Sequence, residues 1–514
     1  MYPGHFAVIT PEKPAVVMGR SREVVTYREL DERSARLAQL LYARGLRPGD
    51  KIALLAENHP RFYEVYWAAM RSGLYMTTVN RYLAPAEAAY LVSDSGATAF
   101  FTTAQMAPTA VPLLELIPDC PIRLMTDGVA DGFESYEAAL ATYPAQPLAD
   151  QPRGDVMLYS SGTTGRPKGI ERPLRGKQID DPSAATMATT LRMLLGMDEH
   201  SVYLCPAPLY HAAGLQWSSG THELGGTVVV MEKFDAEEFM ALVEKDAVTH
   251  TQVVPTMLVR LMKLAPEVRE RYDHSSLECV LHAAAPCPVE VKRQVIEWLG
   301  PIVHEYFAAT EGNGMTFISA ADWLEHPGSV GRPMLGIPHI CDESGAELAV
   351  GETGLIYFEQ EHTPFEYHGD PEKTRASRHP EHDNWSALGD IGYVDRDGYI
   401  FLTDRKAFTV ISGGVNIYPA EIESCLIMHP SVTDVAVFGL PDPEMGEYVH
   451  AVVQPADGVP GSPELAEELL RYAREHLARY KVPRVIDFRA ELPRLPTGKL
   501  YKQGLRDEYR KAMA

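Results

Sequence analysis

One segment, residues 159–169, combines side chains that suit a polyphosphate. It reads Tyr-Ser-Ser-Gly-Thr-Thr-Gly-Arg-Pro-Lys-Gly. Its glycines let backbone N–H groups approach a ligand closely, its hydroxyls add donors, and Lys168 adds a compact positive charge. A P-loop needs glycine before the lysine and Ser or Thr after it, whereas Pro167 and Gly169 stand there. Because proline resists a helix interior, we expect a loop that covers a phosphate. The alternative is a surface turn of small polar residues.

Four other positions carry groups that suit the rest of a nucleotide or an acid. His211 follows a predicted strand and suits the wall of a substrate cleft, although a lone histidine there is more often structural. The alanines at 283–285 would let a flat ring approach closely. Glu311 offers the hard oxygen ligands that Mg²⁺ prefers. The carboxylate of Asp390 is a natural bidentate partner for a vicinal diol.

Two features of the C-terminal half have simpler explanations beside the functional ones. Lys499 stands in a Pro-x-Gly-Lys turn, which presents a lysine on a rigid loop, but such a lysine near a terminus is normally only solvated. His379 and His382 could suggest a metal site. The Pro, Asp and Asn residues beside them favour an exposed loop instead.

Alternating patterns predict the framework that positions these side chains. Thr26 to Glu29 forms a capping box, which predicts the start of a helix. Predicted helices and strands then alternate, as is typical of a layered α/β domain. The predicted helices are 60–72, 86–95, 187–195, 236–245 and 255–264, and the predicted strands are 51–56, 74–79, 97–102, 122–125, 201–205, 227–231, 277–282 and 303–307.

A smaller α/β region is predicted at the C-terminal end. A predicted strand at 398–403 leads through Arg405 into a segment with two adjacent glycines. Beyond it, helices are predicted at 420–428 and 463–477, and strands at 432–438 and 448–453. This order is consistent with a separate small domain.

Length and charge limit the class of protein. A chain of 514 residues exceeds the usual size of one core, so two or more domains are expected. The formal net charge of −23 argues against nucleic acid or an anionic membrane as the main partner. An anionic substrate then needs a local positive patch. The candidates around the first segment are Arg166, Lys168, Arg172, Arg175 and Lys177.

The cysteines and the hydropathy pattern predict a cytoplasmic protein. The six cysteines form no Cys-x-x-Cys pair, so we expect reduced thiols rather than a zinc or disulfide framework. The first residues do not resemble a signal peptide, and no apolar run approaches the ~18 residues of a membrane span. The sequence leaves the oligomeric state open, and a homodimer is one option.

Taken in order, these segments resemble five motifs of the adenylate-forming superfamily of acyl-CoA synthetases, luciferases and peptide-synthetase adenylation domains. The resemblance covers nearly the whole chain, and the sequence is identified as a member of the acyl-CoA synthetases, or ligases, of the fatty-acyl and 4-coumarate–CoA ligase type. It implies an α/β fold with a large multilayer N-terminal AMP-binding domain, residues 1–404. A small mobile α+β C-terminal domain, residues 405–514, would follow on a hinge.

The resemblance also implies a role for each matching residue. Lys499 would lie between the acid's carboxylate and the α-phosphate, where a point charge assists displacement. Glu311 would hold Mg²⁺, and His211 would face the acyl group. Catalytic roles fall on Lys168, His211, Thr310, Glu311 and Lys499. Nucleotide contacts fall on Ser160, Ser161, Gly162, Thr163, Thr164, Gly165, Ala284, Ala285, Pro286, Phe307, Thr310, Asp390 and Arg405, coenzyme A contacts on Gly413 and Gly414, and the hinge on Ala407.

The chain departs from the family's pattern in two places. Phe307 stands where tyrosine is commoner, and Ala308 where glycine is usual, so the nucleotide would be slightly crowded. Ala407 stands at the hinge where Asp or Lys is usual, and the apolar Phe408 follows it. We expect this hinge to favour one orientation of the small domain, with the thioester-forming orientation as our preference.

The implied activity has two steps and uses ATP, Mg²⁺ and coenzyme A. A carboxylate attacks the α-phosphate of ATP to give acyl-AMP, and the thiol of coenzyme A then attacks the acyl-AMP. Three alternatives remain: an adenylation enzyme that loads a separate carrier protein, a ligase specialised for the thioester step from supplied acyl-AMP of a bulky natural-product acid, and a nucleotide-binding protein with little activity. Small residues at 212–214 and 283–285 suggest room for a fatty, alicyclic or terpenoid acid.

Overall fold

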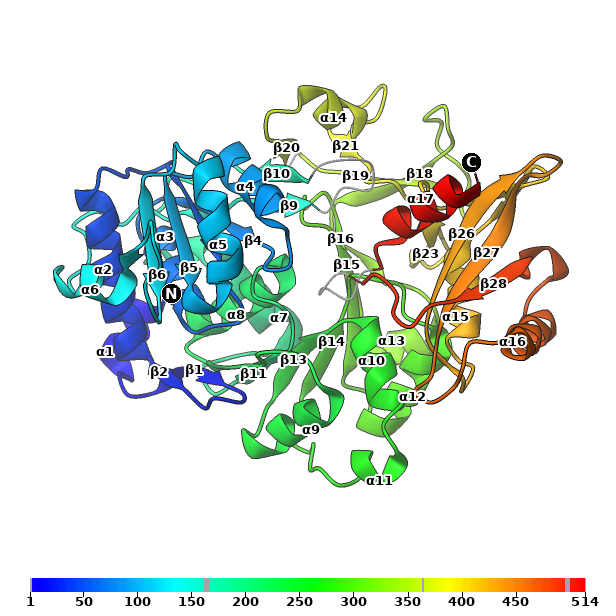
Figure 1. Ribbon diagram of the computed structural model, residues 1–514, viewed down its shortest axis with the longest axis horizontal. Coiled ribbons are helices and arrows are strands. Elements are labelled where there is room, and N and C mark those ends of the chain that lie inside the picture. The colour runs from blue at the N-terminus through cyan, green and yellow to red at the C-terminus, as the bar shows by residue number, and fades with distance from the viewer. Residues whose placement is uncertain (1, 161–166, 363–364, 495–499, 514) are drawn as a thin grey trace. The chain divides into compact units, whose positions relative to one another are not determined.

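Figure 1 shows the computed structural model, which describes residues 2–160, 167–362, 365–494 and 500–513. The chain divides into two compact units. Unit 1 contains residues 1–253, 264–281 and 365–371, and unit 2 contains residues 254–263, 282–364 and 372–514. Within the described residues, none of the helices has the length and apolar character that a membrane span requires.

Unit 1 contains a parallel sheet with the strand order β7-β6-β5-β3-β4-β8. Parallel neighbours need crossover connections, and helices supply most of them. An apolar cluster packs α4 and α5 against this sheet. The strands are β3 (Lys51–Leu55), β4 (Tyr75–Val79), β5 (Ala99–Thr103), β6 (Ile122–Thr126), β7 (Glu134–Ser135) and β8 (Asp155–Val156), and the helices are α2 (Tyr27–Ala43), α3 (Arg61–Met70), α4 (Pro85–Asp94), α5 (Ala107–Leu113) and α6 (Tyr136–Ala141).

A second group of strands in unit 1 has the order β13-β11-β12-β1-β2. The N-terminal strand β1 lies parallel to β12 and antiparallel to β2. The strands are β1 (Pro14–Met18), β2 (Val24–Thr26), β11 (Val202–Cys205), β12 (Thr227–Val230) and β13 (His250–Val253), and β14 (Cys279–His282) ends at the boundary of the unit. The helices are α1 (Pro3–Ile9), α7 (Thr186–Leu195), α8 (Ala212–Leu224), α9 (Ala236–Lys245) and α11 (Pro266–Arg269).

The predicted phosphate loop connects two strands of a small antiparallel sheet in unit 1. β9 (Leu158–Ser160) and β10 (Lys168–Glu171) pair with each other, and β10 also pairs with β20 (Glu366–Tyr367). The described residues on either side of this segment are therefore antiparallel neighbours, and Lys168 begins a strand rather than a helix.

Unit 2 begins with antiparallel strands. β15 (Val303–Ala308), β16 (Met315–Ile318) and β17 (Arg332–Leu335) pair in sequence. A separate sheet has the order β18-β19-β22-β23, with β21 beside β19. Its strands are β18 (Ile337–Cys341), β19 (Gly354–Glu359), β21 (Trp385–Ser386), β22 (Asp390–Val394) and β23 (Ile400–Arg405), and the helices are α10 (Pro255–Met262), α12 (Val289–Leu299), α13 (Ala320–Glu325) and α14 (Pro371–Ala376), whose first residue belongs to unit 1.

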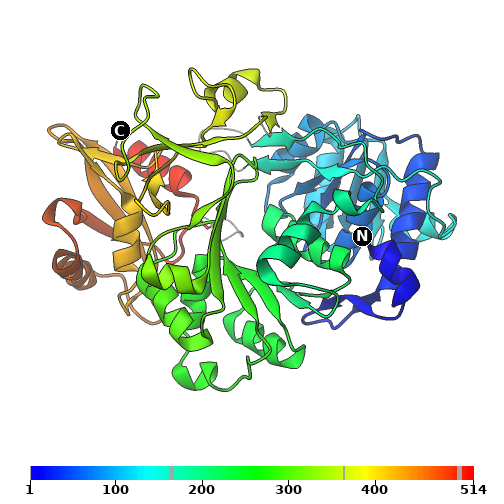
Figure 2. The same ribbon diagram turned by 180° about the vertical axis from the view of Figure 1, so that it is seen from behind.

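The C-terminal part of unit 2 is built on a long antiparallel hairpin. β26 (Val432–Asp442) pairs with β27 (Gly446–Pro455), and β28 (Val485–Phe488) adds a parallel strand. The short strands β24 (Val410–Ser412) and β25 (Val415–Ile417) complete the sheet, and its helices are α15 (Pro419–Leu426), α16 (Pro463–His476) and α17 (Lys502–Met513). In Figures 1 and 2 the red helix α17 lies against the orange hairpin, where it contacts β26.

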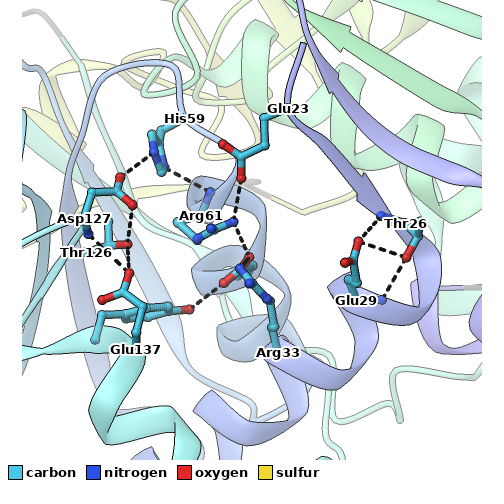
Figure 3. Close-up of polar contacts among 11 residues, drawn as sticks. Glu23, Thr26, Glu29, Arg33, His59, Arg61, Thr126, Asp127 and Glu137 are labelled. Atoms are coloured by element: carbon cyan, nitrogen blue, oxygen red, sulfur yellow. Dashed lines mark hydrogen bonds and ion pairs between the residues drawn. The ribbon is translucent and has the colours of Figure 1, made fainter. Parts of the chain in front are cut away.

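Most predicted elements are present, with boundaries shifted by a few residues. The predicted capping box is confirmed: Thr26 Oγ1 accepts from Glu29 N at 3.2 Å, and Glu29 Oε2 accepts from Thr26 N at 2.9 Å (Figure 3). One interpretation is wrong in part. His382 is exposed in a loop as predicted, but His379 is buried, and its Nε2 donates to Gly345 O at 2.8 Å.

A buried carboxylate joins α2 to α3 in unit 1. The carboxylate of Glu64 is fully buried and pairs with Arg33 at 2.9 Å and Arg61 at 3.1 Å. The hydroxyl of Tyr136 donates to the second oxygen at 3.0 Å. In Figure 3 the two arginines come from different helices, Arg33 from α2 and Arg61 from α3. A buried charge is tolerated only when it is paired in this way.

His222, on α8, lies in the centre of the unit 1 core. Its Nδ1 accepts from Trp67 Nε1 at 3.3 Å, so the Nε2–H donates to Ala15 O at 3.0 Å. Tyr63 packs edge-on to its ring at 4.8 Å. Burial in these apolar surroundings lowers the pKa of His222 to about 4. The imidazole is therefore neutral in the folded protein.

This histidine should make unit 1 acid-sensitive. Its stabilising contribution is complete above pH 6.5, the pKa of a solvated histidine, and is lost as the pH falls towards about 4, because the unfolded chain binds the proton first. The loss should reach about 3 kcal/mol. His222→Gln retains one acceptor and one donor but does not titrate. Urea unfolding between pH 7 and 4 should show a free energy that falls more steeply in the wild type. Parallel profiles would contradict the assignment.

Candidate active site

The two described ends of the phosphate loop lie opposite each other. Ser160 closes β9 and pairs in register with Lys168, the first residue of β10. Five of the predicted nucleotide-binding residues lie outside the described residues: Ser161, Gly162, Thr163, Thr164 and Gly165. The backbone next to the loop is anchored by Tyr90, whose hydroxyl donates to Pro167 O at 3.1 Å. The hairpin thus brings Lys168 to the base of the loop.

Lys168 already has an anionic partner. Its Nζ lies 3.1 Å from Asp370 Oδ2, on the segment that follows β20. This hydrogen bond raises the pKa of Lys168 above its usual value. Both side chains are about a quarter exposed, so solvent screens the pair. An arriving phosphate would compete with the Asp370 carboxylate for this lysine.

His211 lies directly before α8 and serves as its N-cap residue. Its carbonyl accepts from Leu215 N at 2.9 Å, and its side chain is half-buried. The small residue Gly214 has a packing reason, because a Cβ there would stand 2.4 Å from Pro208 O. Gly214 therefore reflects close backbone packing, and of residues 212–214 only Ala212 and Ala213 remain as signs of room for an acid.

The alanine segment after β14 contains a backbone irregularity in unit 2. Ala284 is exposed and has φ +79°, a left-handed conformation that costs an L-residue about 1–2 kcal/mol. Ala285 is half-buried and Pro286 is exposed. The turn directs the chain away from the strand, and such strain is commonly retained where backbone geometry has a use.

Phe307, Thr310 and Glu311 follow one another from the end of β15 into a tight turn. Phe307 is half-buried and lies 6.4 Å from the ring of Phe358. Glu311 is only 8% exposed. The turn is fixed from the other side by Gln360, whose Nε2 donates to Gly312 O at 2.8 Å and to Asn313 O at 2.7 Å. The carboxylate is thus held on a rigid backbone.

The two predicted ribose ligands contact each other. Asp390 begins β22, Arg405 ends β23, and the two residues pair in register across these strands. Arg405 Nε lies 3.0 Å from Asp390 Oδ1. Asp390 is largely buried, whereas the arginine side chain is 40% exposed. Two residues chosen from separate motifs therefore form one ion pair.

The predicted hinge and coenzyme A residues lie just beyond Arg405. Ala407 is half-buried, and Gly413 and Gly414 have positive φ angles of +56° and +79°. A Cβ at Gly413 would lie 2.5 Å from Met445 Cε, the end of a flexible, exposed side chain that can move, so glycine is favoured there by its conformation rather than by space. Lys499 falls outside the described residues, three positions before α17 begins.

A buried polar cluster behind the alanine segment was not predicted by any sequence pattern. Lys292 Nζ, on α12, lies 2.6 Å from Glu305 Oε2, on β15, and both residues are buried. His282, the last residue of β14, is 3.4 Å from the same oxygen. Burial lowers the pKa of Lys292 and raises that of Glu305, while their attraction opposes both shifts. A single Lys and Glu thirteen positions apart form no recognisable motif.

Two other polar groups in unit 2 bear on metal binding. Within the described residues, His326, Asp395 and Asp397 form the group whose ligand atoms converge closely enough to hold an ion. Asp395 Oδ1 there accepts two backbone N–H groups of its own turn. His379 and His382 instead stack beside Trp385, which gives them a packing role.

Comparisons with known proteins agree with the motif order. The AMP-binding enzyme family matches residues 5–367, and the AMP-binding enzyme C-terminal domain matches residues 421–499. A feruloyl-CoA synthase from an Amycolatopsis species is 34% identical, covering 99% of this chain and 98% of its own. A fatty acid–[acyl-carrier-protein] ligase from Streptomyces coeruleorubidus is 32% identical over 97% of this chain and 94% of its own. The solved structure of the o-succinylbenzoate CoA synthetase from Bacillus subtilis, with its acyl-adenylate, has a TM-score of 0.79 at 26% identity, covering 98% and 97%.

The chain therefore belongs to the AMP-binding enzyme family, the adenylate-forming ligases. The predicted family, fold class and enzyme class are confirmed. The individual site residues and the domain boundary at 404/405 stay predictions.

The contact between Lys168 and Asp370 generates one prediction. Asp370→Asn keeps the shape of the side chain and removes its charge, so Lys168 becomes available to phosphate. The Kd for ATP should fall about two- to fivefold, the range of a screened ion pair. Glu366→Gln removes an equal charge from exposed β20 nearby and serves as the control. Calorimetric titration measures both. Equal effects in the two variants would show that only net charge matters.

The strained alanine generates a second prediction. Ala284→Gly should raise the unfolding free energy by about 0.5–1 kcal/mol, because glycine adopts a positive φ without strain. Ala285→Gly, next to it but with a negative φ, should lower stability through the added freedom of the unfolded chain. Urea unfolding of both variants provides the measurement. A loss of stability in both would mean that Ala284 is unstrained.

Proposed function

We propose that the protein is an ATP-dependent acyl-CoA ligase that activates a carboxylic acid as acyl-AMP and transfers the acyl group to coenzyme A. The observation that carries this proposal is the family match over residues 5–367 and 421–499, together with the Asp390–Arg405 pair between the two matched regions. Asp390 and Arg405 are 15 positions apart in the sequence, and the motifs alone do not show that their side chains meet. Their contact gives one site in which a carboxylate can bind a ribose diol beside a guanidinium.

In the first step, a carboxylate oxygen of the acid attacks the α-phosphorus of ATP, and the bond to the bridging oxygen breaks to release pyrophosphate. Lys168 offsets charge on the phosphates, and Lys499 supplies a positive charge between the carboxylate and the α-phosphate. Phe307 and the Ala284–Pro286 turn contact the adenine. Asp390 and Arg405 hold the ribose, and Thr310 donates to the α-phosphate or the acyl carboxylate.

Mg²⁺ fits the chemistry of Glu311. The carboxylate offers the hard oxygen ligands that this ion prefers, and Gln360 fixes the backbone of the turn that carries it. When bound, the ion neutralises charge on the phosphates. Glu311 would hold it, and the rigidity of the turn limits how far the carboxylate can shift.

In the second step, the thiol of coenzyme A loses its proton, its sulfur attacks the acyl carbon, and AMP departs. The small domain, residues 405–514, turns about Ala407 between the steps and withdraws Lys499. Gly413 and Gly414 then line the thiol tunnel, where the lack of side chains leaves space. The two family matches, ending at 367 and starting at 421, lie on either side of this boundary and support it.

A second candidate function is the loading of a separate acyl carrier protein. It is favoured by the 32% identity to a fatty acid–[acyl-carrier-protein] ligase. In both functions the first step is the same and only the thiol acceptor differs. Thioester formation with coenzyme A and with phosphopantetheinyl carrier protein, measured side by side, separates them. A screen of fatty, aromatic and alicyclic acids by pyrophosphate release identifies the acid.

The same proposal includes the cellular compartment and the binding partners of the enzyme. All six cysteines are free thiols, which supports a reducing cytoplasmic environment. The function requires only small-molecule substrates and no nucleic acid. A homodimer is compatible with it.

The assignment of Lys499 generates a prediction that tests the two-step scheme. Lys499→Ala should slow ATP–pyrophosphate exchange by at least a hundredfold, because the positive charge at the reacting phosphate is lost. Thioester formation from supplied acyl-AMP and coenzyme A should change less than threefold. The two half-reactions of one variant act as controls for each other. An equal loss in both would mean that the lysine only maintains the fold.

A further inference from the structure

The two sides of the hinge have different long-range hydrogen-bond partners in unit 2. On the N-terminal side, Arg405 pairs with Asp390, and Lys406 N donates to Gly389 O at 2.9 Å. On the C-terminal side, Ala407 O accepts from Arg506 Nη1 at 3.0 Å. The Lys406–Ala407 peptide thus separates these two sets of partners, and only a local turn spans it, in which Phe408 N and Thr409 N donate to Arg405 O at 2.9 Å and 3.3 Å.

Helix α17 supplies the partners on the C-terminal side. Lys502, Arg506 and Arg510 recur at intervals of four, so their side chains share one face of this helix. The ring of Phe408 lies against the first two, with Lys502 Nζ at 5.2 Å and Arg506 Cζ at 5.7 Å from its centroid. These distances are within the range of cation–π attraction.

Further contacts anchor the helix to the segment after the hinge. Arg510 Nη2 lies 3.0 Å from Glu447 Oε1, and the other oxygen of Glu447 accepts from Ile411 N at 3.1 Å. Lys502 Nζ lies 2.7 Å from Glu423 Oε1. The segment 407–411 is therefore fixed to α17 at a carbonyl, at a ring and, through Glu447, at an amide.

Arg506 is the residue on which this arrangement depends most. Its Nη2 donates to Gln503 Oε1 at 2.6 Å, which orients the guanidinium, and its buried Nε has no hydrogen-bond partner among the described residues. Burial, together with the nearby Arg510, lowers the pKa of Arg506 below its usual value. Burial costs the Arg506 guanidinium part of its solvation. Because the group is nevertheless held beside a backbone carbonyl, it makes a specific contact and is not a solvated surface charge.

We propose that Arg506 and Phe408 form a latch that fixes Ala407 to α17, so that rotation of the small domain is confined to the torsions beside the Lys406–Ala407 peptide. Because α17 begins three residues after Lys499, the latch also makes Arg506 a positioning residue for that lysine. The structural part stands by itself, whereas the positioning part rests on the proposed ligase function. Rotation has to break the contacts that cross this peptide. Ala420 N donates to Asp404 Oδ2 at 3.1 Å, and Phe408 N and Thr409 N donate to Arg405 O.

The latch is consistent with the unusual residues at the hinge. An acidic residue at position 408 would meet the two cations of α17 through solvent-screened attraction and a lysine would be repelled, whereas the Phe408 ring packs on both side chains. The alanine at 407 adds no side chain that could compete for Arg506. At the hinge, packing of Phe408 against the C-terminal helix α17 thus takes the place of a charged side chain.

Limited trypsin digestion tests the latch without any substrate. The side chain of Lys406 is 58% exposed, so cleavage after it reports how freely the hinge backbone opens. In the full-length protein, Arg506→Met should speed release of the fragment that starts at Ala407 about tenfold, and Phe408→Leu about threefold. Arg506→Lys, which keeps a cationic donor, should restore most of the protection. Lys511→Met removes an exposed charge from the same helix and is the matched control. Equal cleavage of Arg506→Met and Lys511→Met would overturn the latch.

The half-reactions test the positioning role. Arg506→Met should slow acyl-AMP formation about tenfold, while thioester formation from supplied acyl-AMP changes less than threefold, because only the first step needs Lys499 in place. Loss of stability alone would lower both rates together. If Arg506→Met opens the hinge to trypsin but leaves the ratio of the two rates unchanged, the latch does not position Lys499 and that part is wrong. If the wild type forms no acyl-AMP, the ligase function and the positioning role fall together, and the digestion result still decides the latch.

Discussion

The contact between Asp390 and Arg405 is the interaction on which much of unit 2 depends. It links the first residue of β22 to the last residue of β23, so one ion pair closes the end of the sheet where the chain leaves for its C-terminal part. A largely buried carboxylate without a cation would be costly. The guanidinium removes that cost and leaves Lys406, the next residue, in a fixed position. The hinge therefore starts from a defined point.

The sequence could predict elements whose signals are local. The capping box at Thr26 and the alternation of helix and strand depend on neighbouring residues, and both are found where expected. α8 was missed because all its faces are buried. Its polar side chains are satisfied within the core, as when Thr221 Oγ1 donates to Trp217 O at 2.9 Å. A helix of that kind shows no amphipathic period.

Contacts between residues that are far apart in the sequence could not be predicted from the sequence. Lys292 and Glu305 each look like surface residues until α12 and β15 pack together and bury them as a pair. His379 was read from its polar neighbours as exposed, but its ring packs against Tyr357 and Trp385. The motifs located the candidate site residues because chemistry fixes their types and order. Their supporting contacts are set by packing, which many residue types can satisfy.

A chain with a net charge of −23 has to bind a polyanion without leaving an open positive patch that attracts other anions. Two of the cations that we assign to ATP already carry a carboxylate partner. The Lys168–Asp370 pair is exposed to solvent, so exchanging the carboxylate for a phosphate costs little. In the Asp390–Arg405 pair the carboxylate is more enclosed, 12% exposed against 24% for Asp370, and the proposed ribose contact does not require the pair to separate. We infer a division between one pair that opens for the ligand and one that remains closed. With this division, the negative net charge of the chain opposes non-specific binding of anions. A nucleotide that fits the site can still bind Lys168 and Arg405.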